Sequence, residues 1–198
     1  MRSYKEYCGV AMALDLVGQR WTLLLVRDLL PGPRRFRDLT LPGLTPNVLS
    51  DRLHHLEAHG LVENVLLPPP ASCHAWQLTE AGRRLEPVVL ALGGFGAAYM
   101  GDPDGFTMDL RWLMVSLMRR YGGGLDGLIA VHAPSAVYTL ALTPDRLVSR
   151  DGAPVRPDAA LHADLPALGA LLGRRQEDAP VRIEGDRELV FRLVRGLA

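Results

Sequence analysis

A proline-glycine break between two short helical patterns constrains the N-terminal half of this chain more than any other feature. Residues 34–39 predict a short helix, and Leu41-Pro42-Gly43-Leu44 cannot continue it, because proline lacks the amide proton and glycine favours a turn. Thr45-Pro46 then supplies a hydroxyl cap and a proline at the first helical position, so a second helix is expected there. Gly60 is expected to end that helix.

Further helices and a ribbon are expected around this break. Ser3 and Glu6 have the spacing of a capping box, which predicts a helix from about Tyr4 to Gly18. One face of it carries Tyr7, Ala11 and Leu14, with Cys8 beside them. Residues 21–30 predict a second apolar helix, residues 61–67 and 73–78 a two-stranded ribbon, and residues 79–100 a last helix. Helix, turn, helix and ribbon is the order of a winged helix-turn-helix domain, whose second helix enters the DNA major groove.

Five consecutive turn-forming residues, 101–105, predict a boundary between an N-terminal domain, 1–104, and a C-terminal domain, 105–198. Beyond it, apolar residues between Leu110 and Tyr121 recur at helical spacing, and the pattern then alternates with a period of two. Strands are expected near 136–142, 159–163 and 181–183, and helices over 165–172 and 189–197. The expected fold class is α+β: a winged helix-turn-helix domain followed by an α+β domain with an antiparallel sheet.

The overall charge excludes one simple route to nucleic acid binding. The formal net charge is zero, so a basic surface over the whole molecule is not expected, and any attraction to DNA must be local. The chain lacks a run of about 18 apolar residues, begins with charged and polar residues, and has two cysteines. These features predict a globular cytoplasmic protein with no membrane partner.

The helix beginning at Thr45 supplies the candidate DNA contacts, and Thr45 itself is one of them. Leu49, Leu53 and Leu56 form its apolar stripe, which leaves four residues as candidates for base contacts: Asn47, Ser50, Asp51 and His54. Arg52 flanks the stripe and is expected to bind a phosphate or an internal carboxylate. The expected phosphate clamps are Arg34, Arg35 and Arg37. The alternative is that this polar face is simply solvated.

Five segments resemble the HxlR family of bacterial regulators: Cys8–Leu30, Gly32–Leu39, Pro42–Leu53, Leu56–Val62 and Gln77–Gly82. The resemblance covers roughly the first hundred residues. It implies a homodimeric repressor or activator that binds an operator in double-stranded DNA and dimerises through the first and last helices of the domain. Wings in this family usually carry basic residues, whereas residues 63–70 contain neither lysine nor arginine. A shallow salt dependence of DNA binding is therefore expected.

Cys8 occupies the position where HxlR-like regulators often carry a thiol sensor, so a redox-responsive regulator with a purely structural C-terminal domain is an alternative. The opposing interpretation is an inert, buried cysteine, because Cys8 lies beside the apolar stripe of its helix. The capping box would also place it beyond the first turn, where the helix dipole no longer stabilises a thiolate. His55 and His59 have a spacing that can share a metal, but no further ligands follow at a familiar interval. No metal site and no cofactor are expected.

The C-terminal segments Val137–Leu142, Asp158–Asp164 and Val181–Leu189 resemble a sterol-carrier-protein-type-2-like domain. The resemblance implies an apolar cavity for a hydrophobic small-molecule effector. Its expected lining is Trp112, Met114, Met118, Tyr138 and Leu140. Taken residue by residue, the favoured interpretation of these side chains is a filled core, which would make the domain a scaffold.

An enzyme and a lipid carrier are the alternatives from other classes of protein. No nucleophile elbow, phosphate loop or metal-ligand cluster is present, so no catalytic residues and no enzymatic activity are expected. A lipid carrier that has lost DNA binding is the remaining alternative, and a gel shift with genomic fragments distinguishes it from a regulator.

Overall fold

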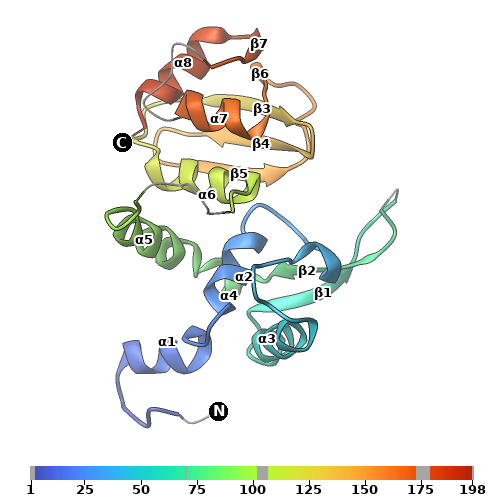
Figure 1. Ribbon diagram of the computed structural model, residues 1–198, viewed down its shortest axis with the longest axis vertical. Coiled ribbons are helices and arrows are strands. Elements are labelled where there is room, and N and C mark those ends of the chain that lie inside the picture. Colours follow the sequence, from blue (N-terminus) through green and yellow to red (C-terminus); the bar gives the residue numbers. More distant parts are fainter. Residues whose placement is uncertain (1–2, 70, 102–106, 173–178, 198) are drawn as a thin grey trace. The chain divides into compact units, whose positions relative to one another are not determined.

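The computed structural model describes residues 3–69, 71–101, 107–172 and 179–197 (Figure 1). The chain divides into two compact units, Met1–Val89 and Leu90–Ala198. The boundary expected near residue 104 lies outside the described residues. No single described helix is long and apolar enough to span a membrane, and the first two helices reach that length together only across a 79° bend.

The N-terminal unit has the expected winged helix-turn-helix order. Its elements are α1 (Gly9–Val17), α2 (Thr22–Leu29), the 3-10 turn η1 (Phe36–Asp38), α3 (Pro46–Ala58), β1 (Val62–Leu66), β2 (His74–Leu78) and α4 (Glu80–Arg83). Leu25, Leu53 and Leu56 are fully buried in its core. The prediction of α2, α3 and the β1–β2 ribbon is confirmed.

The third predicted helix is a single 3-10 turn. Arg34, at its expected start, instead pairs with the wing, donating its backbone N–H to the Trp76 carbonyl at 2.8 Å and accepting from the Trp76 N–H at 2.7 Å. Tertiary pairing with the ribbon therefore overrides the local helical pattern. The helix expected over 79–100 is also interrupted, because α4 ends at Arg83 and α5 (Glu86–Ala97) begins next to Pro87.

The first helix begins at Gly9, so the capping-box prediction is wrong. The Ser3 hydroxyl donates to Asp15 Oδ2 at 2.6 Å, and the Tyr4 N–H donates to Asp15 Oδ1 at 3.1 Å. The first described residues therefore bond to the side of α1 instead of extending it. Ala11 is buried as expected, whereas Tyr7 and Leu14 are exposed.

The C-terminal unit places helices on one face of a five-stranded sheet (Figure 1). After α5, its elements are α6 (Leu110–Arg120), β3 (Gly127–Ala133), β4 (Ala136–Leu142), β5 (Leu147–Asp151), β6 (Ala159–His162), α7 (Leu165–Leu172), β7 (Arg182–Gly185) and α8 (Arg187–Arg195). The strand order is β5-β4-β3-β6-β7. Ile129, Leu140 and Leu161 face α6, α7 and α8 in one apolar core.

The sheet is mixed, which corrects the expected antiparallel sheet. β3 and β6 pair in parallel, while the other pairs are antiparallel. The segment between β5 and β6 carries the chain from the β5 edge to the far side of β3, and β6 then runs alongside β3. The period-two alternation determines which face a side chain occupies but not the direction of the neighbouring strand.

Candidate nucleic-acid interface

Helix α3 is positioned by its cap and its buried stripe. The Thr45 hydroxyl accepts a hydrogen bond from the Val48 N–H at 3.4 Å, with Pro46 at the first helical position. Leu49, Leu53 and Leu56 are buried, as the sequence predicts. One side of the helix is thus anchored in the core and the other side is exposed.

The exposed side of α3 brings together the four candidates for base contacts. Asn47, Asp51 and His54 are exposed and Ser50 is half-buried. Ser50 Oγ and His54 Nδ1 lie 3.3 Å apart. The His54 ring packs edge-on against the Trp76 ring of β2, with 6.1 Å between the two ring centroids. His54 is therefore held against the wing, whereas Asn47 and Asp51 project from the first two turns of the helix.

Arg52 is half-buried between the two sides of α3. Its Nε is buried without a hydrogen-bond partner, and no ion pair joins its guanidinium to the part of the chain that the structure describes. The internal ion pair expected as one alternative is not found among those residues. The phosphate contact remains as the prediction for Arg52.

The expected phosphate clamps lie beside a carboxylate of their own. Arg35 Nε is 3.2 Å from Asp38 Oδ2, and Arg37 Nε is 3.8 Å from Asp38 Oδ1. Arg34 donates from its side chain to the Pro33 carbonyl at 3.0 Å. Asp38 therefore offsets part of this local charge. The shallow salt dependence of DNA binding stays a prediction.

His74 is a candidate that sequence reasoning missed. It is exposed on β2, and its Nδ1 lies 2.7 Å from Asn64 Oδ1 on β1. Its imidazole gives the exposed face of the wing a hydrogen-bonding side chain. The sequence offers no signal for it beyond a histidine in a predicted strand.

Cys8 lies at the N-cap of α1, not beyond the first turn as expected. The thiol is exposed, and hydrogen bonding from the backbone N–H groups of Ala11 and Val10 lowers its pKa below the ordinary value of 9.0. These N–H groups belong to the first turn of α1, where a helix offers unsatisfied donors to an anion. The buried, inert cysteine is therefore ruled out by its exposure.

The two histidines with metal-sharing spacing bond to the backbone. His55 Nε2 lies 2.9 Å from the Leu16 carbonyl, and His59 Nδ1 lies 2.8 Å from the His55 carbonyl. No group of three or more histidine, cysteine, aspartate or glutamate side chains suited to a metal occurs in the described part of the chain. His55 thus connects α3 to the end of α1.

The residues expected to line an apolar cavity separate into two groups. Met114, Met118, Tyr138 and Leu140 are buried together in the core of the C-terminal unit. Trp112 is half-exposed and lies outside that cluster.

Comparison with known proteins points to one family for the N-terminal half. Residues 16–104 match the family described as HxlR-like helix-turn-helix. The uncharacterized HTH-type transcriptional regulator YvaP of Bacillus subtilis is 37% identical over 94 residues, which cover 46% of this chain and 86% of YvaP. Rv3095 of Mycobacterium tuberculosis, also an uncharacterized HTH-type transcriptional regulator, is 40% identical over 104 residues; these span 52% of this chain and 66% of Rv3095.

Two solved structures of similar proteins align with about half of this chain. The redox regulator HypR in its oxidized form is 31% identical, with 48% of this chain and all of HypR covered and a TM-score of 0.44. The reduced form of the transcriptional regulator YodB from B. subtilis is 30% identical, with 49% of this chain and all of YodB covered and a TM-score of 0.42.

Proposed function

Because this chain belongs to the HxlR-like helix-turn-helix family of transcriptional regulators, we propose that it binds operator DNA as a homodimer, with α3 in the major groove. The observation that carries this proposal is the division of α3 into a buried leucine stripe and an exposed polar side. A helix held in this way presents several hydrogen-bonding side chains at one surface, as recognition helices do.

The side chains on that surface suit different partners. Asn47 pairs with adenine through its amide, Ser50 donates or accepts, and Asp51 accepts from cytosine. Arg34, Arg35 and Arg37 bind phosphates and set the position of the domain without selecting sequence. Together these contacts give a regulator whose specificity comes from α3.

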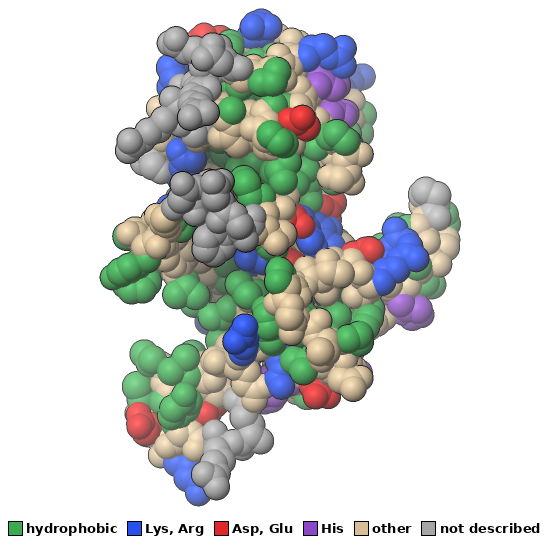
Figure 2. Space-filling view, in the orientation of Figure 1, with side chains coloured by type: hydrophobic (Ala, Val, Ile, Leu, Met, Phe, Trp, Pro, Cys, Tyr) green, Lys and Arg blue, Asp and Glu red, His purple; other side chains and the backbone are tan. Residues whose placement is uncertain are grey.

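Exposed apolar stripes on two helices support the homodimer. Along α5 and just beyond it, the stripe is Val88, Leu92, Phe95 and Tyr99, which are 47–75% exposed. On α1, the exposed apolar side chains are Val10, Met12 and Leu14. Figure 2 shows hydrophobic side chains gathered over both helices. Apolar stripes of this length on adjacent turns are typical of helix-helix interfaces, and a second copy of the chain covers both in this proposal.

Replacing Asn47 by alanine tests the operator contact. We expect Asn47→Ala to weaken binding to the selected operator by about tenfold per half-site, since a bidentate base contact contributes about 1–3 kcal/mol. The operator is first obtained by a gel shift of the full-length protein with genomic fragments, followed by footprinting. Binding of the variant is then measured on that site and on the same site with single base changes.

Ser135→Ala is the control, because Ser135 is an exposed polar residue in the turn between β3 and β4, outside α3, the arginine cluster and the wing. It should leave the sequence preference unchanged. The proposal fails if the purified protein retains no duplex, or if Asn47→Ala keeps both the affinity and the base preference of the parent.

An apolar effector in the C-terminal unit stays a prediction. Four of its five expected contacts fill the core, as a scaffold would require. The resemblance to a sterol-carrier-like domain likewise rests on sequence pattern alone.

Redox sensing through Cys8 is a second candidate function, favoured by the exposure of its thiol and by the first-turn amides that lower its pKa. Peroxide oxidises such a thiolate to a sulfenic acid and is itself reduced to hydroxide. A sulfenic acid at Cys8 alters the N-cap of α1. Because α1 carries one of the two exposed apolar stripes, we expect oxidation of Cys8 to alter dimerisation.

Alkylation kinetics test the state of this thiol. With a lowered pKa, the reactive thiolate of Cys8 persists to lower pH than an ordinary thiolate and is lost as pH falls through that pKa. The iodoacetamide reaction rate of Cys8, followed by peptide mass spectrometry, should therefore show a midpoint below pH 9.0. Cys8→Ser should abolish peroxide-induced release of DNA, and an undiminished response in that variant would discard the sensor.

A further inference from the structure

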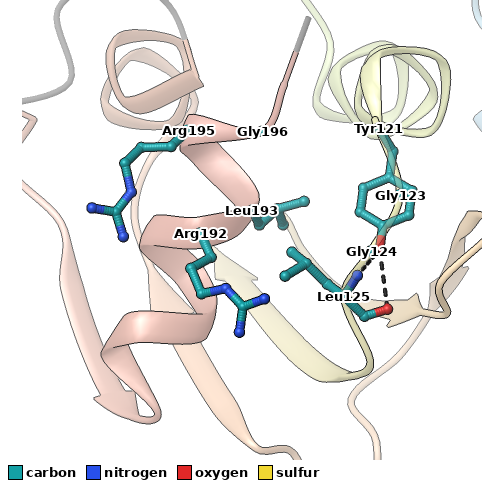
Figure 3. Close-up of a pocket in the computed structure, with 8 residues that line it drawn as sticks. All are labelled: Tyr121, Gly123, Gly124, Leu125, Arg192, Leu193, Arg195 and Gly196. Carbon is teal, nitrogen blue, oxygen red and sulfur yellow. Dashed lines mark hydrogen bonds between the residues drawn. The ribbon is translucent and has the colours of Figure 1, made fainter.

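A pocket of about 370 Å³ opens between the loop after α6 and the last turns of α8 (Figure 3). It lies wholly within the C-terminal unit. The residues that line it are Tyr121, Gly123, Gly124, Leu125, Arg192, Leu193, Arg195 and Gly196. None of them belongs to the apolar lining expected from the sequence.

Glycines allow close backbone approaches beside this pocket. Gly123 has a φ of +88°, and a Cβ there would approach the Pro144 carbonyl oxygen to 2.6 Å. A Cβ on Gly122 would lie 3.0 Å from the Gly196 carbonyl oxygen. Larger residues at these positions would therefore displace the loop or the end of α8.

Hydrogen bonds hold the loop in place. The Tyr121 hydroxyl accepts from the Leu125 N–H at 2.9 Å (Figure 3). The Thr143 carbonyl lies 2.9 Å from the same hydroxyl and accepts from it. The Gly124 N–H donates to the Pro144 carbonyl at 2.8 Å. The pocket is thus formed before any ligand arrives, which lowers the entropic cost of binding.

The charge in the pocket is positive. Arg192 and Arg195 are its charged lining residues, and no carboxylate of the described residues lines it. Arg195 forms an ion pair with Glu188, whereas no described carboxylate pairs with Arg192. Figure 3 shows the Arg192 side chain extending from α8 toward Leu125. One uncompensated guanidinium therefore faces the hollow.

The remaining surface is partly apolar. Leu125 and Leu193 are 8% and 3% exposed and form the floor beneath Arg192. We propose that this pocket binds a small organic monocarboxylate, whose carboxylate pairs with Arg192 and whose apolar part lies on the two leucines. A single free arginine with an apolar floor suits a monoanion with a hydrocarbon body better than inorganic phosphate, which is fully polar. This site goes beyond DNA binding and does not depend on it.

Arg192 also lies in the last turn of α8, where a cation stabilises a helix without any ligand. That structural role predicts a lower melting temperature for Arg192→Gln and no selective ligand binding. The carboxylate site predicts a ligand affinity that depends on Arg192. The two interpretations therefore differ in a binding measurement.

The experiment is calorimetric titration of the full chain with benzoate and hexanoate, with benzamide, hexanamide and inorganic phosphate as the comparison probes. We expect both carboxylates to bind and their uncharged amides to bind at least tenfold more weakly. Arg192→Gln should reduce carboxylate affinity by about tenfold, and Arg192→Lys should retain part of it, because lysine keeps the charge but loses the bidentate geometry.

Arg150→Gln is the control, since Arg150 is exposed on β5 and does not line the pocket. It should bind both carboxylates like the parent. Equal binding of benzoate and benzamide, unchanged carboxylate affinity in Arg192→Gln, or phosphate binding in preference to both carboxylates would each overturn the proposal. Unliganded melting curves of each variant show whether folding is intact.

Discussion

Replacing Phe95 by glutamate should convert the protein to a monomer and remove operator binding. Phe95 is 66% exposed on α5 and contacts Tyr99 ring to ring at 5.1 Å, so the substitution disturbs little within one chain. Because a two-fold interface contains the same residue from both protomers, the substitution places two carboxylates in the apolar contact. With about 2 kcal/mol lost per copy of a hot-spot aromatic, dimer affinity should fall by on the order of a thousandfold.

Sedimentation velocity and gel shifts on the same preparations give the two readouts. Val155→Glu is the matched control, because Val155 is also an exposed apolar residue and lies in the C-terminal unit outside both stripes. It should remain dimeric and bind DNA. A Phe95→Glu protein that sediments as a dimer and shifts the operator normally would contradict the assigned interface.

Helix α3 and the wing were predictable because their signals are local. Thr45 and Pro46 mark the start of α3, and Leu49, Leu53 and Leu56 define its buried side at helical spacing. The proline-rich tip separates two β-favouring runs that pair as expected. The candidate base contacts follow from the same geometry, since the residues opposite a buried stripe must be exposed.

The N-terminal segment was not predictable in this way. Ser3 and Glu6 satisfy the capping pattern, but Ser3 bonds to Asp15, twelve residues along the chain. A distant carboxylate thus competes successfully for the hydroxyl that a local rule assigns to a helix cap. As a result, the helix start moves to Gly9, and Cys8 moves from an expected interior position to an exposed N-cap.

The C-terminal unit shows a different limit. The alternation of apolar and polar residues identified β4 and β6 and the side of each strand that faces the core. The parallel pairing of β3 with β6 depends instead on a connection that crosses the sheet. The pocket was equally hidden, because the Gly123 loop and Arg192 are distant in the sequence. Only the tertiary arrangement places the glycine loop next to Arg192, which has no carboxylate partner among the described residues.

Gly82→Ala should cause the largest loss of stability in the N-terminal unit. Gly82 lies in α4, and a Cβ built on it would come within 1.9 Å of the Leu61 carbonyl oxygen. That oxygen accepts a hydrogen bond from the Thr79 N–H at 3.1 Å, so it cannot move without breaking the junction between the wing and α4. A backbone clash of this kind belongs to the exceptional class of about 4 kcal/mol or more.

Hydrogen exchange followed by mass spectrometry measures this loss within one chain. Peptides from α3, β1 and β2 should exchange faster in Gly82→Ala, whereas β3 and β4 in the other unit serve as the internal control. Gly96→Ala makes the same chemical change in α5 with nothing within 4 Å of the new Cβ, and helix propensity should make it neutral or slightly stabilising. Unchanged exchange in the wing of Gly82→Ala would show that α4 does not pack on Leu61 as described. In that case the placement of the wing beside α3, on which the proposed DNA surface depends, would have to be revised.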